Sequence, residues 1–278
     1  MLRDELDILE CRLTELEDED VTHVLVEATV DHRGQPKPLA YAENRDRFAR
    51  WADKIVHVPV DDLDGTGDWG WEENQREMVR RGLTDAAPGD VIINSDIDEI
   101  LTPNAIRAAE QVGDGPGWRL LLRHFIYTCD WEIINGEVWD KPAMARYEDI
   151  PNFTWLRRMG RPPQAPPEFG PMGWHLSFFG GPAQVIAKVE SNCHPDNRDQ
   201  FKQMAGDGSW ERGEFAFYPW QAVPVEPDES WPRWVREGRA PACWFRPRCG
   251  ALPLLPHPVP YGVSEHFHAE RVGPAAAN

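Results

Sequence analysis

Apolar residues recur along the first half of the chain at two different spacings. A leucine stripe predicts an amphipathic helix over residues 4–18, because its members lie three or four positions apart: Leu6, Leu9, Leu13 and Leu16. Short runs rich in β-branched residues predict strands at 24–28, 55–60 and 90–94, and helical patterns separate them at 44–54 and 71–83. This alternation of helices and strands predicts a parallel, Rossmann-like sheet.

The pattern changes after residue 100. Thr102 and Pro103 predict the start of a helix that ends near Val112, because proline suits the first helical position. A long apolar run at 118–128 predicts a strand, and Asn135-Gly136 between strand-like flanks predicts a hairpin. We therefore expect an α/β fold whose mixed sheet is flanked by helices.

Proline-rich stretches set the expected boundaries of the domain. Residues 161–171 predict a long irregular loop, of the kind that often covers an active site. Residues 248–278 are rich in proline and alanine and show no periodicity, which predicts a poorly ordered tail. The sequence thus predicts one folded domain over residues 1–247.

The strand predicted at 90–94 leads into two carboxylates, Asp96 and Asp98. Ligands of open α/β sheets bind beyond the carboxyl ends of the strands, and two neighbouring carboxylates can reach a hard cation that also holds a diphosphate. The same spacing occurs at Asp18 to Asp20 and at Asp62 to Asp64, but neither copy follows an apolar strand. The pattern therefore favours the metal site of a nucleotide-sugar or phosphate enzyme, with a structural turn as the alternative.

Composition narrows the classes of partner. The net charge of -18 repels the phosphate backbone of nucleic acid, so we expect no nucleic-acid partner, and an anionic substrate would need a metal. The chain has no apolar run of about 18 residues and no signal-peptide core at its start, which predicts a cytoplasmic protein without a membrane span. Its five cysteines lack Cys-x-x-Cys spacing, so neither a zinc knuckle nor a disulfide framework is expected.

Several short motifs follow one another along the chain. They are Asp4 to Leu13, Glu27-Ala28, Gly34 to Leu39, Gln75-Arg76, Ser95 to Ile100, Arg123 to Tyr127, Gly173-Trp174-His175 and the segment from Lys188 to His194. In their order and approximate spacing, over roughly residues 4–247, the chain resembles glycosyltransferase family 17. Several ordered motifs are far more specific than an isolated Asp-x-Asp pair.

The resemblance implies a GT-A-like nucleotide-binding fold and an inverting transferase. It implies a UDP-sugar donor, with N-acetylglucosamine as the first candidate for the transferred sugar. It also implies a glycan or other hydroxyl acceptor, and Mn²⁺ or Mg²⁺ as cofactor. Relatives carry one more apolar strand before the first helix. We therefore expect the nucleotide fold to lack its usual first strand or to have it supplied differently.

The resemblance also implies roles for individual residues. The metal ligands are expected to be Asp96, Asp98 and His194, and the residues that meet the donor are expected to be Asp96, Glu27, Lys188 and Trp174. Asp130 is expected to be the base and His175 to act at the sugar pocket. Three of these residues have structural alternatives, since Glu27 could cap a turn, Trp174 could be core and His194 could be a solvated loop histidine.

Two other functions stay open from the sequence. A phosphatase of the haloacid-dehalogenase type also uses a strand-end Asp-x-Asp, as nucleophile and acid. That family carries Thr or Val two residues past the second Asp, where this chain has Ile100, and its motif usually lies close to the N-terminus. A non-catalytic carbohydrate-binding relative is the second alternative, because a nucleotide fold without its first strand could still bind metal.

Overall fold

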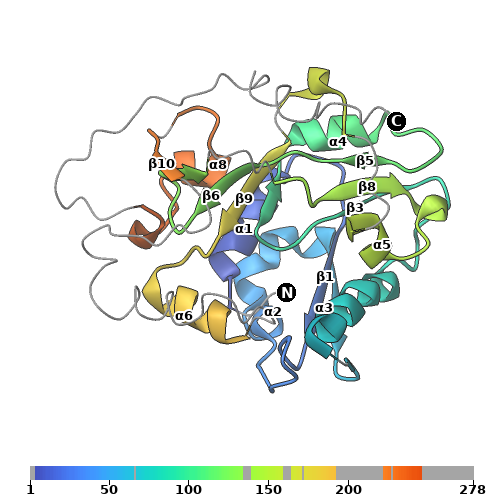
Figure 1. The fold of residues 1–278 in the computed structure, drawn as a ribbon, viewed down its shortest axis with the longest axis horizontal. Coiled ribbons are helices and arrows are strands. Elements are labelled where there is room, and N and C mark those ends of the chain that lie inside the picture. Colours follow the sequence, from blue (N-terminus) through green and yellow to red (C-terminus); the bar gives the residue numbers. More distant parts are fainter. Residues whose placement is uncertain are drawn as a thin grey trace, which may run out of the picture.

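The computed structural model describes residues 4–65, 67–133, 139–158, 164–170, 172–191, 222–226 and 228–245 (Figure 1). The hairpin predicted at Asn135-Gly136, residues 161–163 and 171 of the predicted loop, His194 and the predicted tail lie outside these residues. The predictions made for them, and the domain boundary at 247, stay predictions.

The N-terminal elements form a helix-covered pair of parallel strands. They are α1 (Leu6–Glu15), β1 (His23–Ala28), α2 (Ala40–Glu43), the 3₁₀ helix η1 (Arg45–Lys54) and β2 (Ile55–Val60). β1 and β2 run parallel, with His23 opposite Ile55. Most of the predicted leucine stripe is buried, namely Leu9, Leu13 and Leu16, whereas Leu6 is half-buried. Part of the stripe packs against Phe48 and Trp51 of η1.

The third predicted strand departs from the expected parallel sheet. After α3 (Gly67–Glu77) and the 3₁₀ helix η2 (Met78–Gly82), β3 (Val91–Asn94) pairs antiparallel with β8 (Ala143–Arg146). β5 (Trp118–Arg119) lies on the other side of β8, so the order is β3-β8-β5. The prediction that β3 continues the parallel arrangement of β1 and β2 was wrong for this pairing, because its partner is contributed by a segment about fifty residues downstream.

A larger sheet confirms the expected mixture of directions. Its order is β10 (Ala222–Pro224), β7 (Trp131–Ile133), β6 (Arg123–Ile126), β9 (Gly173–Ser177) and β4 (Glu99–Leu101). β6 and β9 are parallel, whereas the other neighbours are antiparallel. The strand predicted at 118–128 is divided between β5 and β6, because the chain leaves the β8 sheet and joins β9.

The remaining helices cover these sheets (Figure 1). They are α4 (Pro103–Ala109), α5 (Phe153–Arg158), α6 (Pro182–Ser191), α8 (Arg233–Arg236) and the 3₁₀ helices η3 (Tyr147–Asp149), η4 (Pro167–Phe169) and η5 (Ala242–Trp244). A tryptophan-rich core joins α1 to the large sheet, with Trp174, Trp231 and Trp244 buried in it. Among the residues that the structure describes, none of the helices has both the length and the apolar character needed to cross a membrane.

Candidate active site

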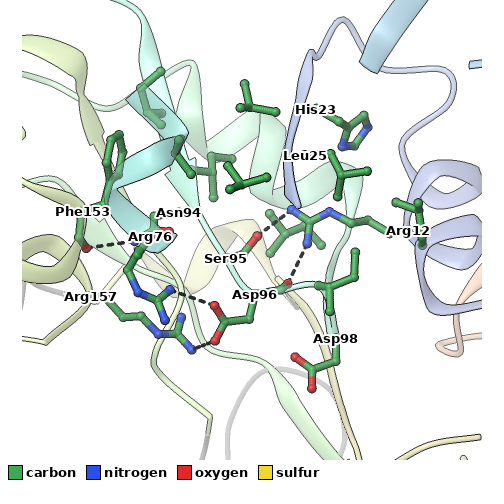
Figure 2. A pocket seen from close by; sticks show the side chains of 18 of the residues that line it. Arg12, His23, Leu25, Arg76, Asn94, Ser95, Asp96, Asp98, Phe153 and Arg157 are labelled. Carbon is green, nitrogen blue, oxygen red and sulfur yellow. Dashed lines mark hydrogen bonds and ion pairs between the residues drawn. The ribbon is translucent and has the colours of Figure 1, made fainter. Parts of the chain in front are cut away.

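The acidic residues of the Asp-x-Asp motif lie in the turn between β3 and β4. The backbone N–H of Glu99 donates to the Asp96 carbonyl over 3.1 Å, which closes the turn. Arg12 of α1 also holds the turn. Its guanidinium donates to the Asp96 carbonyl (2.9 Å), the Glu99 carbonyl (3.0 Å) and the Ser95 hydroxyl (2.6 Å). Figure 2 shows Arg12 reaching from its helix to this turn. The turn is therefore held in place by a charge on a separate helix.

Two arginines hold the Asp96 carboxylate. Arg76 of α3 donates to Oδ1 over 2.8 Å, and Arg157 of α5 donates to Oδ2 over 2.5 Å (Figure 2). Burial alone raises the pKa of Asp96, but the two guanidiniums outweigh it and hold this pKa well below its ordinary value. Asp96 is thus ionised and already paired on both oxygens.

Glu99 organises the same cluster from a fully buried position. Arg157 donates to both of its oxygens, over 2.8 Å to Oε1 and 3.1 Å to Oε2. The Trp139 indole N–H donates to Oε1 over 2.5 Å, and the Asp96 backbone N–H donates to Oε2 over the same distance. Glu99 therefore orients Arg157 against Asp96 and ties both to the turn.

Asp98 has a different set of partners. The Lys188 ammonium of α6 donates to Oδ2 over 2.6 Å, and His175 Nε2 lies 3.8 Å from the same oxygen. Lys188 also donates to Glu5 over 3.1 Å. Burial raises the pKa of Asp98, but Lys188 and His175 outweigh it and lower this pKa well below its ordinary value. Asp98 is therefore a carboxylate with one close ammonium partner.

His175 lies in a layer of stacked rings on β9, β6 and the segment after β7. Its ring stacks on Trp139 with centroids 3.7 Å apart and lies 4.5 Å from the ring of His124. The Ser177 hydroxyl lies between the two histidines, 3.2 Å from His175 Nε2 and 3.1 Å from His124 Nε2. Burial, with a smaller effect from His175, lowers the pKa of His124 to about 2. His124 is consequently neutral beside His175.

The buried His124 predicts a loss of stability in mild acid. Its ordinary pKa of 6.5 applies in the unfolded chain, so below that pH the unfolded state binds a proton that the folded state does not. The free energy of unfolding therefore falls as pH drops from about 6.5 to about 4, with His124 contributing up to about 1.4 kcal/mol per pH unit. Urea denaturation at several pH values measures this slope. In His124→Asn the slope should be shallower by about that amount, and an unchanged slope would contradict the prediction.

One cavity of about 1960 Å³ brings these groups together. Its walls include four of the residues predicted from the sequence, which are Asp96, Asp98, Lys188 and His175. They also include the three guanidiniums that hold the turn, which belong to Arg12, Arg76 and Arg157. Carboxylates, cations and an imidazole thus surround one solvent-accessible space at the carboxyl end of β3.

The structure places three other predicted site residues away from that cavity, whereas His194 lies outside the described residues. Glu27 is fully buried and accepts the N–H groups of Tyr41 (2.9 Å) and Ala42 (3.4 Å), so its carboxylate caps the start of α2. Trp174 is in the tryptophan-rich core, which was its structural alternative. Asp130 lies buried between β6 and β7 and does not line the cavity.

Sequence reasoning missed the arginines around the motif. Arg12 and Arg76 belong to segments that carry the family resemblance, so those motifs held a signal for them. Arg157 had no such signal, because it lies 58 positions after Glu99 and meets it only through the packing of α5. The charges that neutralise Asp96 could therefore be only partly anticipated.

The described residues supply only part of the coordination that a bound metal ion needs. Among them, no group of three or more histidine, cysteine or acidic side chains gathers to hold one. Asp96 is occupied by Arg76 and Arg157, whereas Asp98 lines the cavity with Lys188 as its close partner. Asp98 can supply one oxygen to a hard divalent cation, which would take its remaining ligands from a substrate diphosphate or water.

Comparison with known proteins gave one match. The family model described as Glycosyltransferase family 17 matches residues 1–207, well over half of the 278-residue chain. The match confirms the resemblance inferred from the ordered motifs and includes β3, β9 and α6, which carry the cavity residues. The curated proteins gave no match, and neither did the solved structures.

Proposed function

The chain belongs to glycosyltransferase family 17, and on that premise we propose that it transfers a sugar from a UDP-sugar to a glycan or other hydroxyl acceptor. N-acetylglucosamine is the first candidate for the transferred sugar. The proposal includes inversion at the sugar carbon and a requirement for Mn²⁺ or Mg²⁺. One observation carries the proposal about the donor: the Asp-x-Asp turn at the end of β3 faces a cavity that also holds Lys188 and His175.

The charges of the cavity suit a diphosphate leaving group. Transfer breaks the bond between the sugar and the UDP oxygen, so negative charge builds on the diphosphate as the acceptor oxygen attaches. The Lys188 ammonium lines the cavity beside Asp98 and can donate to that diphosphate. A cation bound at Asp98 supplies Lewis-acid stabilisation of the same charge, an effect worth several kcal/mol.

The acceptor hydroxyl must lose its proton during an inverting transfer. General-base catalysis of this step typically contributes about 10²- to 10⁴-fold in rate. His175 is the predicted catalytic residue that lines the cavity, and its Nε2 is 3.8 Å from the Asp98 carboxylate. We assign His175 to the acceptor side of the site, where it orients the hydroxyl or takes its proton. Asp130 stays a prediction made from the sequence.

The release of UDP tests the proposed function directly. The purified protein is incubated with UDP-N-acetylglucosamine or other UDP-sugars, with and without oligosaccharide acceptors, and with Mn²⁺ or excess chelator. We expect release that needs both the acceptor and the metal. Phosphate release from a phosphomonoester without UDP release would favour the phosphatase alternative. Donor binding without any turnover would favour the non-catalytic relative.

In the proposed site Lys188 competes with a divalent cation for the Asp98 carboxylate, so removal of the ammonium should raise the affinity for the metal. We expect Lys188→Met to bind Mn²⁺ at least about tenfold more tightly in the absence of donor, because a unit charge at about 4 Å is worth about 4 kcal/mol at an effective dielectric constant of about 20. The affinity for UDP-sugar should fall in the same variant. Calorimetry measures both.

Lys54→Met is the matched control, since Lys54 donates to the Glu17 and Glu19 carbonyls and does not line the cavity. Its affinity for Mn²⁺ should equal that of the unchanged protein. Equal or weaker Mn²⁺ binding in Lys188→Met would contradict the assignment of Asp98 as the metal ligand.

A further inference from the structure

Strand β9 divides its side chains between the core and the cavity. Trp174 and Leu176 belong to the tryptophan-rich core. His175 and Ser177, which point to the opposite face of the strand, line the cavity. Because successive residues of a strand point to opposite faces, the next residue, Phe178, would return to the core side. Phe178 instead lines the cavity together with Ser177, so the regular alternation ends at this residue.

A left-handed backbone conformation at Phe178 explains the change of direction. Its φ is 57°, a value that bulky residues rarely adopt. Tyr127, which follows the parallel neighbour β6, has a φ of 66°, and its N–H donates to the Ser177 carbonyl over 2.8 Å. Such conformations cost free energy, persist where the surroundings hold them, and cluster at ligand sites. The two strand ends are thus tied together in a conformation that turns Phe178 to the cavity.

The rings of these two left-handed residues lie in different surroundings. Tyr127 is fully buried and does not line the cavity, although its ring centroid is only 6.2 Å from that of Phe178. Phe178 lines the cavity and is half-buried. Complete burial of a ring offsets backbone strain through the hydrophobic effect, and a half-buried ring offsets less of it. An apolar ligand surface would complete the burial of Phe178.

The ring of Phe178 lies beside the ammonium of Lys188. Gly180 and Gly181, with φ values of 104° and 87°, turn the chain from β9 into α6 (Figure 1). Lys188 of that helix comes back to the strand end, with its Nζ 5.8 Å from the centroid of the Phe178 ring. The same Nζ donates to Asp98 over 2.6 Å. Phe178 is therefore next to the groups that we propose to bind the diphosphate of the donor.

The chemistry of a UDP-sugar suits this arrangement. Its sugar is bonded directly to the diphosphate, so the sugar lies next to the groups that hold the diphosphate. A pyranose carries hydroxyls around its edge and C–H groups on its faces, and an aromatic ring offers a flat apolar surface to those C–H groups. Polar residues of the cavity wall, among them His175 and Gln184, can contact the hydroxyls. Phe178 supplies the apolar contact.

We propose that Phe178 forms the apolar wall of the subsite for the transferred sugar, against which a C–H face of the pyranose packs. The inference rests on the proposed function, because it places the sugar beside the groups that bind the diphosphate. Lys188 and Asp98 act on the diphosphate side of the bond that breaks, and Phe178 holds the sugar on the other side. The left-handed backbone is the feature that places the ring there.

A comparison of UDP-N-acetylglucosamine with UDP tests the subsite, because UDP lacks the sugar. Calorimetry with the full chain and Mn²⁺ measures the affinity for each ligand. We expect Phe178→Ala to lose at least about tenfold in affinity for UDP-N-acetylglucosamine and less than about twofold for UDP. Phe178→Tyr keeps the ring and should retain both affinities within about threefold. Alanine keeps a Cβ, so the first substitution does not relieve the left-handed strain.

Phe169→Ala is the matched control. Phe169 is also half-buried, packs against Trp118 and does not line the cavity. Its variant should bind both ligands as the unchanged protein does. Circular dichroism verifies the fold of each variant. Phe178→Leu, which keeps apolar volume without the planar ring, should show a smaller loss than alanine for UDP-N-acetylglucosamine alone, and it replaces the alanine variant if that one does not fold.

Two results would overturn the subsite and leave the proposed function standing. One is an equal loss of affinity for both ligands in Phe178→Ala, because the ring would then only position Lys188 for the diphosphate. The other is unchanged affinity for both ligands. Failure of the unchanged protein to bind either ligand would instead contradict the proposed donor, and the subsite would fail with it.

Discussion

Replacing Asp98 by asparagine should lower the rate of sugar transfer by at least about a thousandfold. Asparagine keeps the shape of the side chain but removes the charge that pairs with Lys188 and that a divalent cation needs. A thousandfold loss corresponds to about 4 kcal/mol of transition-state stabilisation, which is in the range of a Lewis-acid effect. The turnover number for UDP release at saturating donor and Mn²⁺ measures it.

Asp62→Asn is the matched control for Asp98→Asn. Asp62 belongs to another Asp-x-Asp copy, is exposed and pairs with Arg81 on the surface. Its variant should retain turnover within about twofold. A loss of less than tenfold in Asp98→Asn, with the dependence on Mn²⁺ intact, would remove Asp98 from its proposed role.

Replacing Arg157 by methionine should lower the free energy of unfolding by about 3–5 kcal/mol. The change leaves the fully buried Glu99 carboxylate without its bidentate partner and removes one of the two arginines on Asp96. Breaking a buried ion pair from one side costs this much, because the remaining charge stays desolvated. Urea denaturation at pH 7 gives the difference directly.

Arg81→Met serves as the comparison, since Arg81 forms a similar two-point contact with Asp62 but on the exposed surface. Its loss should cost less than about 1 kcal/mol. In the double variant Arg157→Met with Glu99→Leu, much of the lost stability should return, because no unpaired charge remains at Glu99. Equal costs for Arg157→Met and Arg81→Met would show that the buried cluster does not stabilise the turn.

Local patterns predicted many elements of the first half of the chain, because these elements depend on neighbours in the sequence. The leucine spacing predicted α1, the short β-branched runs predicted β1, β2 and β3, and Thr102-Pro103 predicted the start of α4. The placement of Asp96 and Asp98 after an apolar strand singled them out from two other copies of the motif, and both line the cavity.

Local sequence patterns did not predict which strands pair or which groups bind the buried carboxylates. The run at 118–128 is mostly apolar, with Arg119, Arg123 and His124 interrupting it, so it signals burial without showing where the chain changes sheets. Glu27 lies near the end of the largely apolar β1, yet its carboxylate caps α2 inside the core. Both outcomes depend on segments that are distant in the sequence.

The sequence by itself determined the family and several helices and strands of the first half, and it singled out the two carboxylates that line the cavity, since each depends on residue type and spacing along the chain. Only the tertiary structure decided that Arg76 and Arg157 occupy Asp96 while Lys188 holds Asp98. It alone also showed that residues of β1 and β3 line one cavity. The physical reason is that ion pairing and strand pairing depend on distance in space, which spacing along the chain does not specify.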